Sequence, residues 1–239
     1  MFDTFLEKFQ QNFIDDNRWK LLANGLKITL IVTFFAVIIG IILGFIIGII
    51  RSSADTADKR SANKVGYFVL KVSDKICRLY ITVIRGTPVL IQIMIIFYVI
   101  FGSSNNKILA AVIAFGINSA AYVAEIIRSG IMSIDSGQFE AGRCLGFSYA
   151  QTMIFIIIPQ AFKNVLPALA NEFIVLLKET SVSAYIGLTD ITYGANQIRS
   201  RTYEAFFPLI AAALIYLVLV IILSHFVRLL ERRLRNNER

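Results

Sequence analysis

The chain has 239 residues, of which 56% are hydrophobic and only 17% are charged, and its formal net charge is +8. Soluble domains usually contain about 45–50% apolar and about 25% charged residues, so this composition excludes an ordinary soluble fold. Basic residues beside membrane spans normally set topology and contact anionic lipid, which argues against nucleic acid as a partner. The sequence therefore predicts a single membrane domain over residues 1–239.

The first apolar run covers residues 26–50. A helix of this length rises about 1.5 Å per residue and crosses a hydrocarbon core of roughly 30 Å. Gly40, Gly44 and Gly48 recur at every fourth position, so they lie on one face of that helix. Glycine is frequent in membrane helices in general, but this regular spacing predicts a face that packs closely against a neighbouring helix.

Four further apolar runs complete an all-α membrane protein of about five spans, and they cover residues 84–101, 108–127, 153–177 and 206–230. At the start of the second run, Thr87 is expected to cap the helix and Pro88 to occupy its first helical position. The fourth run contains Pro159 and Pro167, and each removes a backbone donor and should bend the helix.

The connections after the first, third and fifth spans hold most of the lysines and arginines. Cytoplasmic loops carry the excess of basic residues, so we expect an outside N-terminus and a cytoplasmic C-terminus. The first cytoplasmic loop, residues 51–85, is long enough to hold an amphipathic helix near the membrane surface.

The predicted cytoplasmic segment 136–147 has the pattern of a short helix that ends in a sharp turn. Ser136 is expected to cap this helix, and Gly146 to end it in a left-handed conformation. Ser148 and Gln151 predict a capping box for the helix that follows. A rigid polar helix at this place suits insertion into a groove of another protein, although the local pattern fits an ordinary interfacial loop equally well.

Several motifs occur together along the chain from about Asn24 to the last span. Glu140-Ala141-Gly142, with Gly146 and Ile158-Pro159, resembles the signature of binding-protein-dependent ABC importer permeases, with Gly142 in place of alanine and Ile158 in place of leucine. Five further motifs resemble the polar amino-acid branch of that family, the histidine and glutamine permease-like proteins. They are Arg85-Gly86-Thr87-Pro88, Ala120-Ala121-Tyr122-Val123-Ala124-Glu125, Gly137-Gln138, Pro159-Gln160-Ala161 and Leu177-Lys178-Glu179-Thr180-Ser181.

This resemblance implies the type I ABC importer permease fold in a bacterial inner or plasma membrane, and translocation of polar amino acids by alternating access. The implied partners are two ATPase subunits, a second permease that is either another copy or a related chain, an extracellular solute-binding protein, the amino-acid substrate and membrane lipid. The segment 136–147 would be the coupling helix, and the residues that contact the ATPase would be Glu140, Ala141, Gly142 and Gly146.

No Gly-x-x-x-x-Gly-Lys-Ser/Thr phosphate loop occurs in the sequence, so the chain is not expected to be an enzyme or to hold a cofactor itself. ATP and Mg²⁺ would belong to the partner ATPase subunit. The two cysteines, Cys77 and Cys144, are placed on the cytoplasmic side and predict neither a disulfide nor a metal site.

Polar residues inside the spans are costly in hydrocarbon and usually face a bundle interior, so they are candidates for a substrate path. These candidates are Tyr98, Asn118, Tyr122, Asn171, Glu172 and Lys178. Glu172 suits the ammonium group of an amino acid and Asn171 its carboxylate, while Tyr98 would close one side. Glu125 and Asn164 are further polar residues of these spans. The alternative is structural, because Glu125 can pair with Arg128, and Asn164 and Lys178 can satisfy helix ends or backbone groups freed near Pro167.

Two other classes of protein fit part of the pattern. An ion-coupled secondary transporter would typically show internal repeats, and none is visible in the sequence. A membrane scaffold that only recruits a soluble partner would need the cytoplasmic segment but no polar path. Copurification with an ATPase subunit, together with ligand-stimulated turnover, separates both from an ATP-driven importer.

Overall fold

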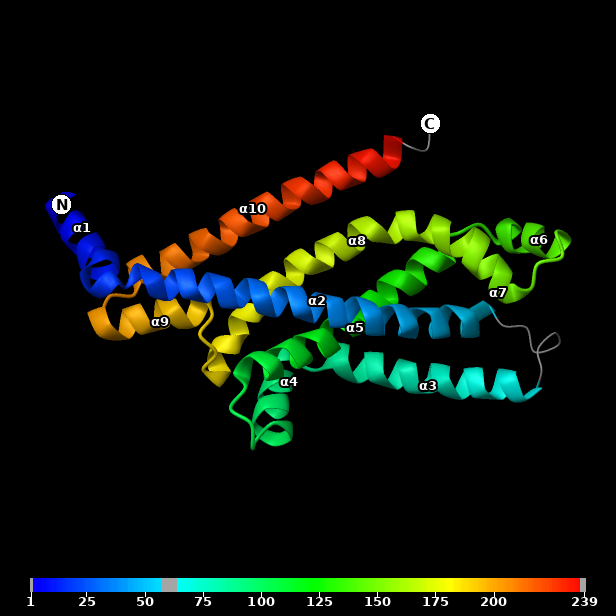
Figure 1. The fold of residues 1–239 in the computed structure, drawn as a ribbon, viewed down its shortest axis with the longest axis horizontal. Helices are drawn as coiled ribbons and strands as arrows, with labels where there is room; N and C mark the ends of the chain where they lie inside the picture. Colours follow the sequence, from blue (N-terminus) through cyan, green and yellow to red (C-terminus); the bar gives the residue numbers. More distant parts are fainter. Residues whose placement is uncertain (1, 57–63, 237–239) are drawn as a thin grey trace. The chain divides into compact units, whose positions relative to one another are not determined.

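A computed structural model describes residues 2–56 and 64–236 of the chain (Figure 1). The part of the predicted loop 51–85 that contains Lys59 and Arg60 lies outside the described residues, as do the last three residues. Within the described ranges all regular structure is helical. The elements, in chain order, are α1 (Phe2–Phe9), a π-helical turn (Gln10–Ile14), a 3-10 turn (Asp15–Asn17), α2 (Trp19–Thr56), α3 (Lys64–Gly86), α4 (Val89–Ile95), a π-helical turn (Ile96–Ile100), α5 (Lys107–Met132), α6 (Ser136–Cys144), α7 (Tyr149–Thr152), a π-helical turn (Met153–Ile157), α8 (Ile158–Glu179), the 3-10 segment η5 (Thr180–Ile186), α9 (Ile191–Thr202) and α10 (Phe206–Asn236).

Four of these helical stretches are long and apolar enough to cross a membrane, namely Trp19–Thr56, Lys107–Met132, Tyr149–Ile186 and Phe206–Leu234. A fifth crossing requires α3 to be counted together with α4 and its π-helical turn, and this pair is bent by 107°. The sequence prediction of about five spans is therefore met only if this broken pair is one of them.

The second span differs from the predicted straight run 84–101 because the helix breaks at Pro88. Pro88 has extended backbone angles and is the N-cap of α4, so the helix begins at Val89. A proline disfavours helical backbone angles in the residue before it, which ends α3 at Gly86. The predicted capping role of Thr87 is wrong, since its Oγ1 donates to the carbonyl oxygen of Val83 in the preceding helix at 2.8 Å.

The chain divides into two compact units, and α2, α5, α8 and α10 contribute residues to both. The first unit comprises Met1–Val37, Pro88–Gly116 and Phe173–Phe226. The second unit comprises Ile38–Thr87, Ile117–Glu172 and Val227–Arg239. Each unit is described by itself below.

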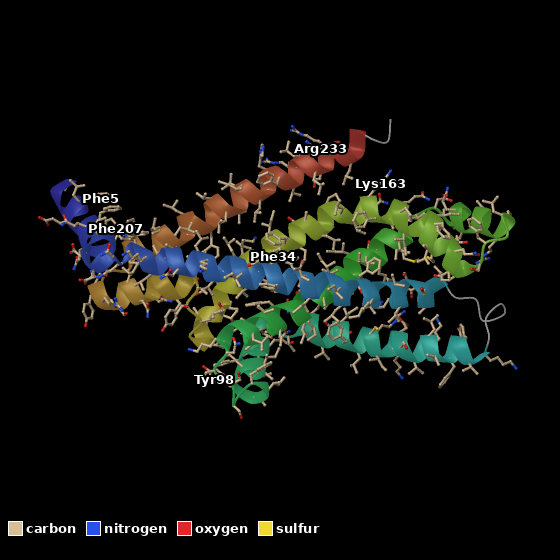
Figure 2. The ribbon with its side chains drawn as sticks, in the orientation of Figure 1. Phe5, Phe34, Tyr98, Lys163, Phe207 and Arg233 are labelled. Atoms are coloured by element: carbon tan, nitrogen blue, oxygen red, sulfur yellow. The ribbon has the colours of Figure 1, made fainter. Side chains whose placement is uncertain are left out.

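In the first unit, α2 and α9 approach closely enough that glycine is required at two points. A Cβ atom on Gly25 would lie 2.5 Å from the carbonyl oxygen of Asp190, and one on Gly194 would lie 2.7 Å from that of Leu21. Buried apolar side chains surround this crossing, and they are Phe13, Leu22, Ile191, Ala195, Ile198 and Ala212. Phe5 and Phe207 pack against each other with ring centres 5.1 Å apart (Figure 2).

In the second unit, the glycine face of α2 packs against α5, as the four-residue spacing predicts. Cβ atoms on Gly40, Gly44 and Gly48 would lie within 2.9 Å of side-chain atoms of α5. The α5 residues that they meet, in the same order, are Ser119, Val123 and Ile127, which are also four apart. The buried apolar core of this unit comes from α5, from the π-helical turn before α8 and from α8 itself, and it consists of Val123, Ile127, Ile131, Met153, Ile157, Ala161 and Val165.

Candidate functional site

A cavity of about 640 Å³ lies in the second unit, on the side of α5 that faces α8. Its lining consists of Arg85, Tyr122, Glu125, Ile126, Arg128, Ser129, Gly130, Ser133, Asn164, Val165, Ala168 and Glu172. The charged groups among these are two carboxylates, Glu125 and Glu172, and two guanidinium groups, Arg85 and Arg128. A free amino acid carries one ammonium and one carboxylate group, so this lining offers a partner of opposite sign to each.

Glu172 projects into the cavity from α8 and is only partly buried. The hydroxyl of Ser119 on α5 donates to its Oε1 at 3.0 Å. This hydrogen bond holds one carboxylate oxygen of Glu172. The carboxylate is thus oriented from a neighbouring helix.

Arg85 closes another part of the lining from the last turn of α3. Its guanidinium carbon lies 5.1 Å from the centre of the Tyr122 ring, within the range of a cation–π contact. Arg85 forms no ion pair with an acidic side chain in the described ranges. Because a guanidinium stacked on a ring still presents its N–H edge, Arg85 remains able to donate to a carboxylate.

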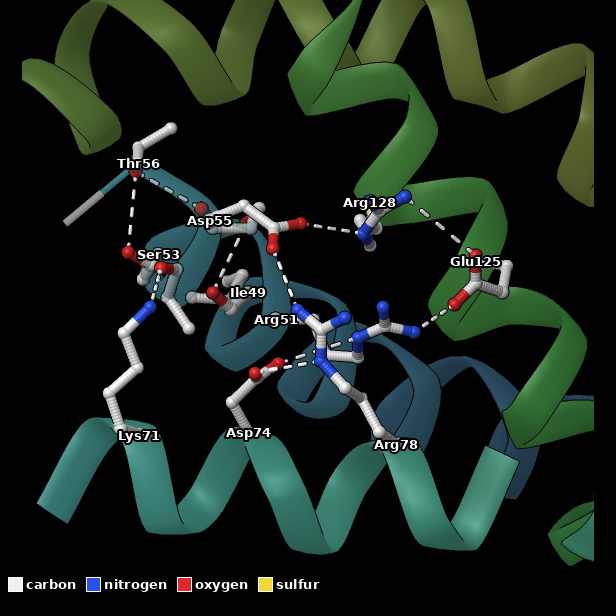
Figure 3. A network of polar contacts seen from close by, with 12 residues as sticks. Ile49, Arg51, Ser53, Asp55, Thr56, Lys71, Asp74, Arg78, Glu125 and Arg128 are labelled. Atoms are coloured by element: carbon white, nitrogen blue, oxygen red, sulfur yellow. Dashed lines mark hydrogen bonds and ion pairs between the residues drawn. The ribbon is translucent and has the colours of Figure 1, made fainter. Parts of the chain in front are cut away.

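The other two charged lining residues, Glu125 and Arg128, belong to a network of ion pairs at the end of α5 (Figure 3). Glu125 accepts from Arg51 of α2, while Arg128 donates through Nε to Asp55 at 2.8 Å. Glu125 and Arg128 also face each other at 3.9 Å, which confirms the pairing that their spacing predicts. Both pocket charges are therefore fixed from outside the pocket.

Residues of α3 complete this network. Asp74 accepts from Arg78 at 2.8 Å and lies 3.6 Å from Arg51, and Arg78 also donates to Asp55 at 2.9 Å. Three arginines thus meet three carboxylates. Arg51 and Asp74 have side chains only 9% and 8% exposed, so each needs its partner to stay charged inside the protein.

Of the six residues that the sequence proposes for a substrate path, the structure places two in the cavity lining, Tyr122 and Glu172. Asn118 is buried on α5 but is not part of the lining, and Asn171 points to the exposed side of α8. Tyr98 and Lys178 belong to the first unit. For these four residues, the assignment to a substrate path remains a prediction.

Sequence reasoning missed part of the polar lining. The sequence marks Arg85 as a loop charge and as part of a family motif, and Ser129 and Ser133 carry no charge that would single them out. Asn164 donates to the hydroxyl of Ser133 at 3.1 Å, which joins α8 to α5 at the cavity wall. The helical repeat does supply a signal, because Tyr122, Ser129 and Ser133 follow one another at intervals of seven and four residues.

The segment 136–147, which the sequence predicts to be cytoplasmic, forms a helix and a sharp turn, and a second helix follows it. Gly146 has a φ angle of +79°, the left-handed conformation that the sequence predicts. The capping box of α7 is also confirmed, since Ser148 N donates to Gln151 Oε1 at 2.8 Å and Gln151 N donates to Ser148 Oγ at 3.3 Å. The predicted cap of α6 is wrong by one position, because Asp135 accepts from Gly137 N and Ser136 is already helical.

Among the four residues assigned to ATPase contact, Glu140, Ala141 and Gly146 are exposed. Gly142 is buried, and a Cβ atom there would lie 2.6 Å from the side chain of Thr152. Gly142 thus allows α6 to pack on α7. Leu145, 70% exposed, adds an apolar side chain beside the turn.

The described residues contain no group of three or more His, Cys, Asp or Glu side chains that would hold a metal ion. Membrane-length helices with a charged pocket and a projecting helical turn are the architecture of a membrane permease. Residues 64–236 match the family of binding-protein-dependent transport system inner membrane components. The chain belongs to this family, whose members are permease subunits of the membrane.

Curated relatives span most of the chain. An arginine transport system permease protein of Bacillus subtilis (strain 168) is 46% identical over 162 residues, which are 66% of this chain and 74% of the relative. A glutamine transport system permease protein of Escherichia coli (strain K12) is 36% identical over 168 residues, which are 69% of this chain and 77% of the relative.

Two solved structures share the fold. The crystal structure of an amino acid ABC transporter with histidines is 42% identical, with a TM-score of 0.79 over 92% of this chain and 98% of that chain. An inward facing conformation of the MetNI methionine ABC transporter is 19% identical, with a TM-score of 0.74 over 90% and 96% of the two chains. The fold is therefore that of type I ABC importer permeases, as the motifs imply.

Proposed function

We propose that this permease subunit translocates polar amino acids across the bacterial inner membrane by alternating access, and that separate ATPase subunits drive it. The observation that carries this proposal is the cavity of the second unit, where Arg85 and Glu172 line the same space. An amino acid fits there with its carboxylate on a guanidinium and its ammonium on a carboxylate. The relatives named for arginine and glutamine transport support this class of substrate.

Energy enters through the cytoplasmic helix α6. Its exposed Glu140 and Ala141, followed by the left-handed Gly146, present a rigid turn to a soluble partner. The chain itself has no nucleotide-binding loop, so ATP and Mg²⁺ are held by that partner. Two ATPase subunits, a second permease and an extracellular solute-binding protein complete the proposed importer.

The proposed orientation follows from the distribution of lysine and arginine. It places the N-terminus outside and the C-terminus in the cytoplasm, with α6 on the cytoplasmic side. Arg228, Arg232 and Arg233 near the end of α10 would then lie at the cytoplasmic surface, where anionic lipid attracts basic residues.

The test is uptake by proteoliposomes that contain this chain, a coexpressed ATPase subunit and the binding protein. We expect accumulation of a radiolabelled polar amino acid that requires ATP and persists when ionophores collapse all ion gradients. Uptake that follows an ion gradient without ATP would instead identify a secondary transporter. An assembly that binds ATPase subunits but moves no amino acid of a panel of twenty would identify a scaffold.

A further inference from the structure

The cavity of the second unit lies beside an ion-pair network whose formal charges cancel. The network joins three arginines to three carboxylates, and its members are Arg51, Asp55, Asp74, Arg78, Glu125 and Arg128. Glu125 and Arg128 also line the cavity, together with one further cation, Arg85, and one further anion, Glu172. The charged side chains of the lining and the network therefore sum to zero.

Two residues of α2 outside the lining hold the two lining charges that belong to the network (Figure 3). Arg51 donates to Glu125, and Asp55, one turn further along the helix, accepts from Arg128 Nε at 2.8 Å. The Arg51 side chain is 9% exposed and that of Asp55 is 18% exposed. Each of these lining charges thus has its counter-charge within the protein before any substrate arrives.

This pairing matters because both lining charges are close enough to the cavity to act on a bound molecule. The side chains of Glu125 and Arg128 are 28% and 29% exposed, so they are partly shielded from water. Charges in such surroundings interact several times more strongly than charges in bulk water. Without Arg51, Glu125 would attract a cationic side chain, and without Asp55, Arg128 would attract an acidic one.

An amino acid with an uncharged side chain matches this balance. Its carboxylate and ammonium groups are complementary to Arg85 and Glu172, and it adds no net charge to the cavity. A cationic or acidic side chain would bring one charge that the balanced lining does not compensate, and an uncompensated charge is costly away from bulk water. The neutral lining residues Ser129, Ser133 and Asn164 offer hydroxyl and amide groups, which suit an amide or hydroxyl side chain.

We propose that Arg51 and Asp55 determine the charge specificity of the cavity: by neutralising Glu125 and Arg128, they make it favour amino acids with uncharged polar side chains over cationic and acidic ones. The inference rests on the proposed function and narrows its substrate class. Removing the charge of Arg51 leaves one excess negative charge and should favour a cationic substrate, whereas removing that of Asp55 should favour an acidic one. Damage to the fold would instead weaken the binding of all amino acids alike.

The test measures equilibrium binding to the full chain with its copurifying ATPase subunits in lipid nanodiscs, without a solute-binding protein, so that the permease alone selects. The probes are radiolabelled L-glutamine, L-glutamate and L-ornithine, whose side chains are similar in length and differ in charge. We expect the wild type to bind L-glutamine with a Kd about tenfold lower than that of either other probe, the effect of one uncompensated charge several ångströms away.

Arg51→Gln should lower the Kd for L-ornithine relative to that for L-glutamine by about tenfold, and Asp55→Asn should do the same for L-glutamate. Arg51→Lys and Asp55→Glu are the matched controls, because they keep the charges and should keep the wild-type preference. Asp55 is the more exposed of the two residues, so its variants keep the test decisive if Arg51→Gln does not fold.

A wild-type preference for L-glutamine that both Arg51→Gln and Asp55→Asn retain would overturn the inference and leave the proposed function intact. A wild type that binds L-ornithine or L-glutamate at least as tightly as L-glutamine would also overturn the inference alone. Absence of saturable binding of all three probes by the wild type, together with absence of ATP-dependent uptake, would overturn the proposed function as well.

Discussion

The guanidinium of Arg85 lies over the ring of Tyr122 at 5.1 Å, at the wall of the cavity that Glu172 also lines. The two residues come from α3 and α5, so the contact fixes a planar cation between two helices. In this position the guanidinium keeps its N–H edge free for an anion while the ring replaces part of its hydration.

Replacing Arg85 should therefore weaken substrate binding more than assembly. We expect Arg85→Lys to raise the KM for amino-acid uptake roughly tenfold, because an ammonium cannot make a bidentate contact with a carboxylate or stack as a guanidinium does. Initial uptake rates in proteoliposomes at varied substrate concentration measure this. Lys75→Ala, an exposed cation on the same helix, is the control, and an unchanged KM in Arg85→Lys would remove Arg85 from the site.

The ion-pair network should contribute strongly to stability at its buried centre. Asp74→Asn removes one of the two carboxylate partners of Arg51 at a site less than a tenth exposed, and because Glu125 still pairs with Arg51 we expect a loss of about 1–3 kcal/mol. Thermal denaturation of the complex in detergent measures the loss. Asp16→Asn removes a carboxylate that is 73% exposed and pairs with Arg18, and it should cost about 0–1 kcal/mol. Equal losses of stability in Asp74→Asn and Asp16→Asn would contradict the stabilising role of the ion-pair network.

The contact between α2 and α5 predicts a steric effect that depends on position. Gly44→Ala places a Cβ atom 2.6 Å from the side chain of Val123 and should destabilise the protein by about 1–3 kcal/mol through overpacking. Gly66→Ala, in α3, meets no atom within 4 Å and should be neutral or stabilising by up to about 1 kcal/mol. Thermal denaturation of both variants measures these effects. A Gly44→Ala variant as stable as the wild type would argue against close packing of α2 and α5.

Asp190 predicts a dependence of stability on pH. Burial raises its pKa from an ordinary 3.8 to about 6, so the folded state holds the proton more tightly than the unfolded state does. Its contribution to stability is fully present below about pH 4 and is lost as pH rises through 6, by about 3 kcal/mol in total. Unfolding midpoints in choline chloride between pH 4 and 7 measure the loss.

Asp190→Asn should remove this pH-dependent loss. The ion pair with Lys8 lowers the pKa of Glu204, which gives a dependence of opposite sign, so the difference between wild type and Asp190→Asn is the informative quantity. An identical pH profile in both proteins would contradict the assignment.

Sequence reasoning recovered the elements that local rules determine. The apolar runs predicted helices, the glycine spacing predicted the α2–α5 contact, and Gly146, Ser148 and Gln151 predicted the turn after α6. It failed at Pro88, where the restriction on the residue before a proline outweighed the capping preference of Thr87. It also failed at Ser136, because Asp135 is an equally good cap that lies one residue earlier.

The pocket was harder to predict because it is assembled from three helices distant in sequence. Glu172 and Tyr122 were found because they are polar residues within apolar runs. Arg85 and Arg128 were read as loop charges that set topology, and nothing local distinguishes that role from lining a cavity.

The central claim is that the cavity beside Glu172 is part of the path of an amino acid through an ATP-driven permease. The most direct measurement is ATP-dependent uptake by proteoliposomes that contain Glu172→Gln, compared with Glu7→Gln, an exposed glutamate of α1. Loss of a charge-assisted contact of about 1.5–3 kcal/mol predicts uptake about 10- to 100-fold lower at subsaturating substrate in Glu172→Gln, with assembly intact and Glu7→Gln unaffected. Wild-type uptake in Glu172→Gln would contradict the account.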